Sequence, residues 1–253
     1  MRTLPEPVSP VAPELRRPRL LRQQWRDVCF LHWAVDPAVV APFMPPGVEP
    51  DVFEGQTYVG LVAFRMVGTG LVRGPAVPWL GSFLETNVRL YSVDATGRRG
   101  VVFRSLDTDR AAVVGIARTV FGLPYRWAWM RFRRSGPERD YVARLRRPGE
   151  RVRSRIVVRA GREVLDGALD RFLTARWGLH VQRFGRAWYL RNTHEPWPLR
   201  AAELVALDDG LLASVGFDGL AQRPPDHVAF SAGVRVTFTL PEVLPRDGET
   251  QSR

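Results

Sequence analysis

The residues Leu84-Glu85-Thr86-Asn87-Val88-Arg89-Leu90-Tyr91 give the clearest indication of the fold of this 253-residue chain. Successive side chains of a strand point to opposite faces, so the four odd-numbered residues, which carry polar groups, share one face, and Leu84, Val88 and Leu90 share the other. The polar face meets solvent if the strand is half exposed, which is the commoner arrangement. If the strand instead belongs to a barrel, a carboxylate, an amide and a guanidinium line the interior and can orient a small polar ligand.

Strands also dominate the sequence on both sides of this stretch. Residues 25–33 form a compact apolar run, and residues 56–67 are apolar on both faces, as in a strand that is covered on both sides. The pattern predicts a hairpin of residues 82–93 and 100–106, joined by a turn at 94–97. Further strands are expected at residues 127–134, 141–145, 153–159, 187–194, 203–207 and 234–240.

Two or three short helices interrupt the strands. Asp36 is a suitable N-cap for a helix over residues 37–43, which begins with a proline. Residues 111–121 repeat apolar side chains at helical spacing and are followed by Gly122, a common residue at the end of a helix. A further helix is expected at 169–177. Together these elements predict an α+β fold, mainly antiparallel β, arranged as a closed or semi-closed β-barrel or cone.

The length and the distribution of prolines predict one domain with loose ends. Residues 1–20 are rich in proline and show no apolar period, so we expect a flexible N-terminal arm, and the polar residues 245–253 are expected to form a flexible tail. A single domain then spans residues 21–244. The sequence shows neither a secretory signal nor an apolar run of about 18 residues, and its one cysteine, Cys29, cannot form an internal disulfide. These features predict a cytoplasmic protein without a membrane partner.

The basic residues are all of one kind. Each of the 37 is an arginine, and the formal net charge is +11. Because the chain has no lysine, no side-chain amine is available to form a Schiff base or to hold pyridoxal phosphate. The arginines are spread through predicted strands and turns, without a recognition helix, a zinc finger or an RNA-binding aromatic pattern. A solvated basic surface is therefore the favoured interpretation, and binding to nucleic acid or acidic partners stays an alternative.

Common cofactor and metal motifs are missing from the sequence. The four histidines, at positions 32, 180, 194 and 227, lack the i,i+2 or i,i+4 spacing of metal ligands. The sequence also lacks a P-loop, a G-x-S-x-G elbow and a G-x-G-x-x-G motif, which disfavours the commonest nucleotide, hydrolase and dinucleotide functions. We therefore expect no metal and no cofactor.

A second group of candidate residues surrounds the end of the helix predicted at 111–121. Arg118 lies beside the apolar stripe of that helix, a position from which a long arginine usually reaches solvent but can also face a cavity. The Gly-x-Pro turn that follows is rigid and can direct Tyr125 and Arg126 toward the same place.

Seven short motifs follow one another along the chain: His32-Trp33-x-Val35-Asp36-Pro37, Pro45-Pro46-Gly47-Val48, Gly60-Leu61-Val62-x-Phe64, Glu85-x-Asn87-Val88-Arg89-x-Tyr91, Ser105-Leu106-Asp107, Phe121-Gly122-Leu123-Pro124-Tyr125 and His194-Glu195-Pro196-Trp197-Pro198-Leu199. In this order they resemble the YqjF-like family of uncharacterised bacterial proteins, which is grouped with the acetoacetate-decarboxylase-like superfamily. The resemblance covers residues 21–240. It implies a β-rich cone or barrel with a central pocket.

The resemblance also implies where the site lies. Acetoacetate decarboxylases carry a reactive lysine pair just after a helix that ends in a Gly-x-Pro turn, and the matching positions are Tyr125 and Arg126. The pocket carboxylate of these relatives falls near Glu85, and an arginine at the end of the helix corresponds to Arg118. Tyr125 cannot form an imine and Arg126 stays protonated, so Schiff-base decarboxylation is not expected.

We therefore expect a small-molecule pocket that binds a carboxylate-bearing or oxygen-rich metabolite without Schiff-base chemistry. Arg118, Arg126 and Arg89 would contact an anionic ligand, and Asn87 would add a hydrogen bond. Assembly into a homo-oligomer stays open.

The alternative is a lysine-independent lyase or hydratase in which Glu85 acts as general acid or base and Tyr125 polarises a carbonyl. It requires Glu85, Asn87, Arg118 and Tyr125 to face one internal cavity. An arginine beside Glu85 should then keep that carboxylate ionised. Trp197, which lies between two prolines, is expected to be a buried structural anchor rather than a catalytic residue.

Overall fold

The computed structural model describes residues 3–15, 17–75, 78–147, 149 and 151–245. In this part of the chain thirteen strands join in one sheet. The strands are β1 (Arg19–Val35), β2 (Val48–Pro50), β3 (Thr57–Leu71), β4 (Phe83–Asp94), β5 (Arg99–Thr108), β6 (Tyr125–Ser135), β7 (Glu138–Leu145), β8 (Arg153–Val164), β9 (Gly178–Arg183), β10 (Arg186–His194), β11 (Leu199–Asp209), β12 (His227–Thr239) and β13 (Glu242–Val243). The helices are α1 (Pro37–Val40), α2 (Ala111–Ile116) and α3 (Ala168–Thr174), with a π-helical turn (Ala117–Phe121) after α2 and short 3-10 turns at 41–43, 213–215 and 220–222.

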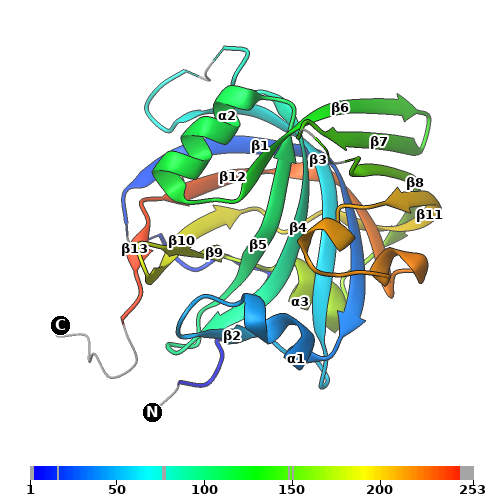
Figure 1. The fold of residues 1–253 in the computed structure, drawn as a ribbon. Coiled ribbons are helices and arrows are strands. Elements are labelled where there is room, and N and C mark those ends of the chain that lie inside the picture. The colour runs from blue at the N-terminus through cyan, green and yellow to red at the C-terminus, as the bar shows by residue number, and fades with distance from the viewer. Residues whose placement is uncertain (1–2, 16, 76–77, 148, 150, 246–253) are drawn as a thin grey trace.

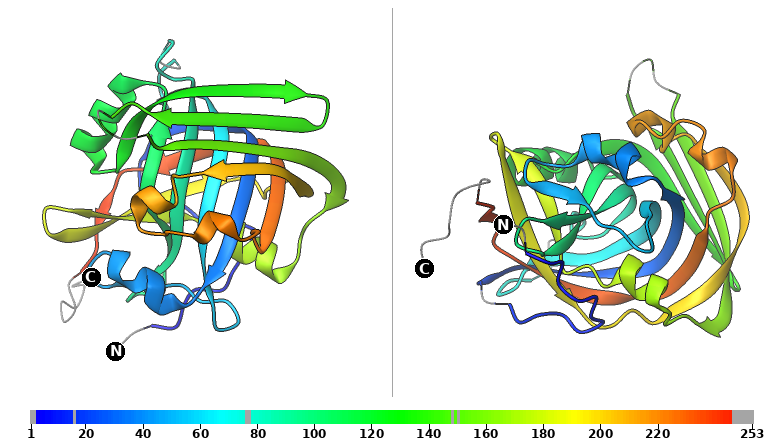
Figure 2. Two further views of the ribbon diagram at one scale, coloured as in Figure 1. Left: turned by 45° about the vertical axis from the view of Figure 1, so that its right-hand side comes forward. Right: turned by 90° about the horizontal axis from the view of Figure 1, so that it is seen from below.

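The sheet closes on itself twice. Besides the pairings between neighbours in its order, β5 pairs with β4 and β10 pairs with β12. These pairings close a small ring of β1, β3, β4, β5, β9, β10 and β12, and a large ring in which β6, β7, β8 and β11 replace β9 and β10. Within the described residues the pairing is antiparallel except where β5 meets β6 and β9. The view from below shows the strands circling the interior, and α2 and α3 lie toward opposite ends of the molecule (Figures 1 and 2).

The strands shared by the two rings are buried on both faces, because each face lines one ring. On β4, Val88 and Leu90 belong to the core of the large ring, whereas Glu85 lines a cavity in the small ring. β1 is divided in the same way between Leu31 and Phe30. The alternation predicted for residues 84–91 is therefore confirmed, but the polar face does not meet solvent.

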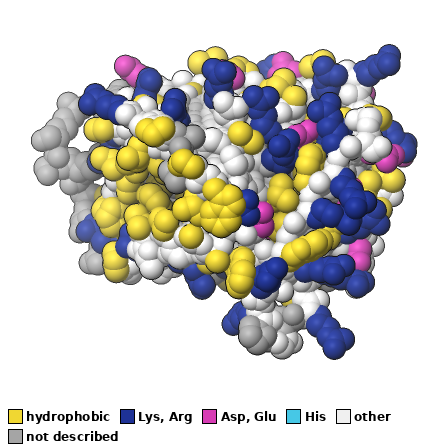
Figure 3. Space-filling view, turned by 90° about the horizontal axis from the view of Figure 1, so that it is seen from above, with side chains coloured by type: hydrophobic (Ala, Val, Ile, Leu, Met, Phe, Trp, Pro, Cys, Tyr) yellow, Lys and Arg dark blue, Asp and Glu magenta, His cyan; other side chains and the backbone are white. Residues whose placement is uncertain are grey.

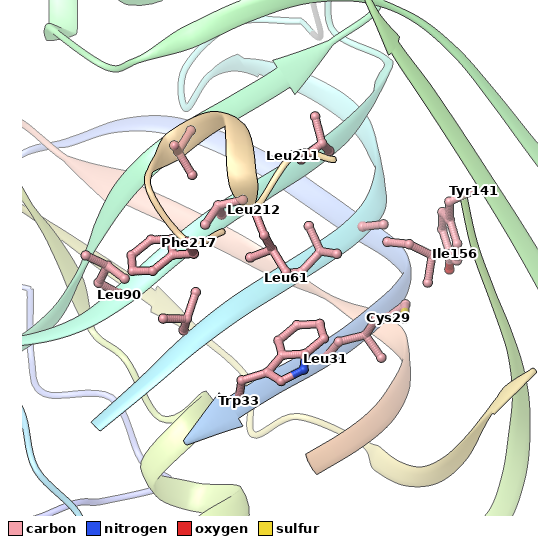
Figure 4. Packing of buried hydrophobic residues seen from close by; sticks show 14 of the residues in the cluster. Cys29, Leu31, Trp33, Leu61, Leu90, Tyr141, Ile156, Leu211, Leu212 and Phe217 are labelled. Atoms are coloured by element: carbon pink, nitrogen blue, oxygen red, sulfur yellow. The ribbon is translucent and has the colours of Figure 1, made fainter. Parts of the chain in front are cut away.

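Hydrophobic side chains fill the large ring. A segment after β11 folds over the shared strands, and its side chains pack onto those of β1, β3 and β4 (Figure 4). The residues in this contact are Leu211, Leu212 and Phe217 on one side and Leu31, Leu61 and Leu90 on the other. The side chains inside the large ring form the main hydrophobic core. Burial of each such side chain stabilises the fold by about 1.5–3 kcal/mol.

The expected fold class, mainly antiparallel β with short helices in a closed barrel, is confirmed. Asp36 caps α1 by accepting a hydrogen bond from the Ala38 N–H at 2.7 Å, and Gly122 ends the second helix with a φ of 68°. Strands β2 and β13 were not predicted, because two or three residues are too few to show a period. Strand β9 was also missed, and the helix expected at 169–177 ends earlier, at Thr174.

The N-terminal boundary of the domain differs from the expected one. β1 begins at Arg19, so residues 19–20 belong to the sheet and not to the proposed arm of residues 1–20. Earlier residues also contact the body: the Glu6 N–H donates to the carbonyl oxygen of Gly97 at 2.8 Å, and the Trp177 Nε1–H donates to that of Ser9 at 3.0 Å. Of the expected tail at 245–253, residues 246–253 lie outside the described residues. None of the described helices is long and apolar enough to cross a membrane.

Candidate functional site

The small ring encloses a cavity of about 280 Å³ between α2 and the inner face of the shared strands. Its wall consists mainly of hydrophobic side chains, such as Phe83 of β4, Leu106 of β5 and Leu179 of β9. Glu85 is the one charged residue among the described residues that line it. The cavity therefore combines an apolar wall with a single ionisable acid, a composition typical of a small-molecule site.

Three of the predicted residues come together, because Tyr125 and Asn87 both contact Glu85. The Tyr125 hydroxyl donates to Glu85 Oε2 at 2.7 Å, and the Asn87 Nδ2–H donates to Oε1 at 3.1 Å. The strand register explains this meeting, because Asn87 pairs with Leu106 across β4 and β5, and Leu106 pairs with Tyr125 across β5 and β6. Asn87 Oδ1 is buried and has no hydrogen-bond partner among the described residues.

The environment of Glu85 changes its acidity. Burial raises the pKa of Glu85 from its ordinary value of 4.5 to about 7, although the hydrogen bonds from Tyr125 and Asn87 lower it. Burial, followed by the charge of Glu85, raises the pKa of Tyr125 well above 10. Near neutral pH, Glu85 is therefore present in both protonation states, whereas Tyr125 keeps its proton.

Arg118 does not join this group, contrary to our expectation. Its side chain is exposed on the π-helical turn, and Ala117 lines the cavity in its place. A guanidinium without a partner is costly to place against an apolar wall, which explains why Arg118 reaches solvent instead. The expectation that an arginine keeps Glu85 ionised is therefore wrong: Glu85 forms no ion pair with the described residues, and its pKa rises.

Arg126 is bound to a carboxylate on the other side of its strand. Its Nε and Nη2 donate to the two oxygens of Asp107 at 2.5 and 2.8 Å, and its Nη1 donates to Ser214 Oγ at 2.9 Å. Because neighbouring side chains on a strand point to opposite faces, Tyr125 lines the cavity and Arg126 does not. Burial raises the pKa of Asp107, although the hydrogen bond from Arg126 lowers it.

Arg89 faces the small ring but lies beyond the cavity, next to α3. Its Nε and Nη2 donate to the Tyr91 hydroxyl oxygen at 3.2 and 3.0 Å, and Nη2 also donates to the carbonyl oxygen of Leu173 at 3.2 Å. The guanidinium carbon lies 5.4 Å from the centre of the Phe30 ring. Arg89 thus binds the end of α3 to the sheet and is not among the residues that line the cavity.

A chain of hydrogen bonds, not predicted from the sequence, continues from Tyr91 to α3. The Tyr91 hydroxyl lies 2.6 Å from His32 Nε2, the Nδ1 atoms of His32 and His227 are 2.9 Å apart, and His227 Nε2 lies 2.9 Å from Asp170 Oδ1. Gly60 leaves room for this chain, because a Cβ there would approach His32 Cδ2 to 3.0 Å. Burial lowers the pKa of both histidines.

Nothing local in the sequence indicated that these four residues meet. His32 and His227 are 195 positions apart and meet because β1 pairs with β12, and Asp170 is supplied by α3. Only the tertiary fold brings them together. Among the described residues, no three His, Cys, Asp or Glu side chains gather as metal ligands would.

Solved structures with the same fold belong to the acetoacetate-decarboxylase-like group. An acetoacetate decarboxylase from Legionella pneumophila is 13% identical, with a TM-score of 0.65 over 92% of each chain. The enduracididine biosynthesis enzyme MppR, solved with HEPES bound, is 18% identical, with a TM-score of 0.64 over 93% of this chain and 90% of MppR. An acetoacetate-decarboxylase-like enzyme from Sphingomonas wittichii RW1 is 15% identical, with a TM-score of 0.65 over 89% of this chain and 93% of that one. These likenesses show the fold.

Relatives by sequence place the chain more narrowly. The uncharacterized protein YqjF of Bacillus subtilis (strain 168) is 34% identical over 187 residues, which is 73% of this chain and 76% of YqjF. The model of the DUF2071 family, described as an uncharacterized conserved protein, matches residues 22–235 and so spans both rings of the sheet. The resemblance inferred from the seven motifs is confirmed, and the chain belongs to the DUF2071 family.

Proposed function

We propose that the cavity of the small ring is a small-molecule site in which Glu85 and Tyr125 bind an uncharged oxygen of the ligand. The observation that carries this proposal is the 2.7 Å hydrogen bond between the two side chains, at the wall of a cavity that is otherwise mostly apolar. A carboxyl and a phenol in such surroundings fix the orientation of a ligand, because they are its main polar partners.

The two protonation states of Glu85 present different groups to a ligand. When Glu85 is ionised, it accepts the hydrogen of Tyr125. When Glu85 is protonated, its own O–H can donate, and the Tyr125 O–H becomes free to donate to a ligand oxygen. Proton uptake at Glu85 therefore creates a donor site for a carbonyl or hydroxyl oxygen.

Acid–base catalysis is the second candidate function, and the pKa of about 7 for Glu85 favours it. A group with a pKa near the working pH is present in useful amounts both as acid and as base. In a lyase or hydratase reaction, Glu85 would take a proton from a carbon next to a carbonyl, while Tyr125 would hold the carbonyl oxygen. The absence of lysine excludes an imine on a side-chain amine of this chain.

The site supports an uncharged oxygen better than the carboxylate that the sequence suggested. Of the three arginines expected to hold an anion, Arg89 is bound to Tyr91, Arg126 is bound to Asp107 and Arg118 is exposed. None of them is among the described residues that line the cavity. One neighbour in fold, MppR, was solved with pyruvate and with a condensation product of pyruvate, which supports a small carbonyl compound as the class of ligand for this fold.

The proposal includes a cytoplasmic location, on the ground of a single cysteine, Cys29, that is buried and free. It takes a small molecule rather than nucleic acid as the main partner, since arginines on the strands are paired with acids. One example is Arg159, which binds both Glu138 and Glu203 at 2.8 Å.

A ligand screen with a matched pair of variants tests the proposal. Small ketones, alcohols and carboxylic acids are added to the protein, and thermal stabilisation is measured at two salt concentrations. We expect ketones or alcohols to stabilise the wild type independently of moderate salt, and Glu85→Leu, which removes the donor, to reduce the effect at least tenfold in ligand concentration. Glu203→Leu, the same change at an exposed site, serves as the control. Equal stabilisation of both variants would refute the role of Glu85, and binding of oligonucleotides that weakens steeply with salt would favour the basic-surface alternative.

A further inference from the structure

We infer that the ligand of this cavity carries a hydrocarbon chain, which runs from an oxygen function at Glu85 toward an opening beside α2. This inference rests on the proposed function, because it takes Glu85 and Tyr125 as the polar end of the site. It goes further by naming the class of ligand and the direction in which the ligand lies.

The wall of the cavity selects against a compact polar ligand. Apart from the Glu85–Tyr125 pair and the Trp25 indole, the polar residues that line it are Gln23, Thr69 and Thr239, all of them uncharged. The remaining lining residues are hydrophobic, apart from one glycine. A sugar or a dicarboxylic acid would leave several polar groups unpaired against this wall, and each would cost binding free energy. A hydrocarbon chain fits, because every methylene that leaves water for this wall improves binding.

The cavity reaches the surface beside α2. Ile116 lines the cavity and is also 54% exposed, so the wall continues to the outside at this residue. Leu80 lines the cavity too, and the neighbouring Trp79 is 72% exposed. Trp79 is held at the start of α2, where the Arg110 guanidinium carbon lies 4.7 Å from its ring centre.

The surface around this opening is hydrophobic. Seen from above, hydrophobic side chains gather on the side of the molecule where α2 lies, whereas arginines prevail on the side of β6 and β7 (Figure 3). Together with Ile116 and Trp79, Val120 on the π-helical turn is half exposed. An apolar path therefore leads from Glu85 to the outside without interruption by a charged residue of the described wall. A hydrocarbon chain of the ligand that extends out of the cavity would cover these exposed side chains, whereas a short ligand would leave them in water.

A homologous series of 2-alkanones, from 2-pentanone to 2-tridecanone, tests this inference. The ketone oxygen is the same in each member, and only the chain length varies. Binding is measured by calorimetry at pH 6, where Glu85 is mainly protonated. We expect the dissociation constant to fall about fourfold for each added methylene until the cavity is full, and then to level off. Pyruvate, which is short and charged, should bind at least tenfold more weakly than the best ketone.

Two variants on the same helical segment test where the hydrocarbon chain of the ligand lies. Ala117→Phe places a ring in the cavity near the opening and should move the plateau to shorter chains, while 2-pentanone keeps its affinity within about twofold. Ala112→Phe is the control, because Ala112 is exposed on α2 and is not among the lining residues. Equal melting temperatures of the two variants would verify that both fold.

The outcomes separate this inference from the proposed function. Ketone binding that requires Glu85 but does not depend on chain length, or tighter binding of pyruvate, would overturn the hydrocarbon chain and leave the site at Glu85 intact. A full dependence on chain length that is unchanged in Glu85→Leu would overturn the proposed role of Glu85. Binding that grows with chain length, levels off, and loses its long-chain gain in Ala117→Phe alone would support both.

Discussion

The Nδ1 atoms of His32 and His227 lie 2.9 Å apart inside the protein, so only one hydrogen fits between them. The Asp170 carboxylate accepts from Nε2 of His227, which leaves Nδ1 of this ring as the acceptor. With both rings neutral, His32 donates through its Nδ1 and accepts the Tyr91 hydroxyl at Nε2, 2.6 Å away, which is closer than the 3.1 Å between that hydroxyl and the Leu173 carbonyl oxygen. The three contacts form a chain with one direction, from Tyr91 to Asp170.

We predict that at neutral pH both histidines are neutral, with His32 as the Nδ1–H tautomer and His227 as the Nε2–H tautomer. Burial lowers the pKa of both rings, and Arg89 adds to this effect on each. Nitrogen-15 NMR of the imidazole rings distinguishes the tautomers directly. His180, which is also buried but lies outside this chain, serves as a reference signal. The opposite tautomer of His32 would show that the chain runs the other way.

We predict that Glu85 makes the stability of the protein depend on pH. Its pKa is 4.5 when unfolded and about 7 when folded, so its contribution is fully present below pH 4.5 and is lost as the pH rises through about 7. The loss should amount to about 3 kcal/mol. Denaturant unfolding of wild type and Glu85→Gln at pH 4.5 and pH 8 measures it as a difference, in which the other titrating groups cancel. A constant difference between the two proteins would show that the carboxyl is not shifted.

The same protonation should control the binding of ketones. A ligand oxygen needs a donor, and the donor exists when Glu85 is protonated, so affinity should be highest below pH 6 and fall tenfold per pH unit well above 7. Tyr125→Phe removes a hydrogen bond that lowers the pKa of Glu85, so the fall should begin at a higher pH. Calorimetric titrations across the pH range test both statements. Affinity that rises with pH would instead identify the ionised carboxylate as the binding form.

We predict that Trp197→Ala destabilises the protein by about 2–3 kcal/mol, less than the 3–5 kcal/mol of a fully buried tryptophan. The ring is half-buried, stacks on Trp25 with 5.8 Å between centres, and meets Phe30 edge-on at 5.1 Å. Its Nε1–H donates to the carbonyl oxygen of Thr174 at 3.2 Å, which ties it to the end of α3. Urea unfolding measures the change, with Trp129→Ala on the exposed face of β6 as the control. A cost equal to that of the control would refute the anchoring role.

Removal of residues 1–14 should lower the melting temperature by a few degrees, because each kcal/mol corresponds to about 2–4 °C in a chain of this size. The deletion takes away the carbonyl groups of Ser9 and Glu6, which accept hydrogen bonds from Trp177 and Arg99. Trp177→Phe, which keeps a ring but loses the donor, should show part of the same effect. An unchanged melting temperature of the truncated protein would instead support a flexible, dispensable arm.

The sequence predicted the strand at 84–91 and the polar face it carries, because the period of two is a local property of the backbone. It could not tell that both faces are buried, since that depends on β4 belonging to two rings at once. The meeting of Glu85 with Tyr125 was foreseen from the resemblance, whereas the outward direction of Arg118 was not. The helix turns to the π form over its last five residues, and the apolar stripe alone does not show which side of it faces the barrel.

Because the shared strands serve both rings, the protein should tolerate substitutions in them better than insertions or deletions. On β4, Phe83 and Glu85 line the cavity, whereas Val88 and Leu90 on the opposite face belong to the hydrophobic core of the large ring, so one strand carries both sets. Substitutions at cavity positions can alter the ligand without touching the core. An insertion or deletion of one residue in β4 would exchange the two sets, place Glu85 among leucines and turn Val88 toward the ligand. Divergence of ligand preference on this scaffold should therefore proceed by substitution within a strand of fixed length, with length changes confined to the loops.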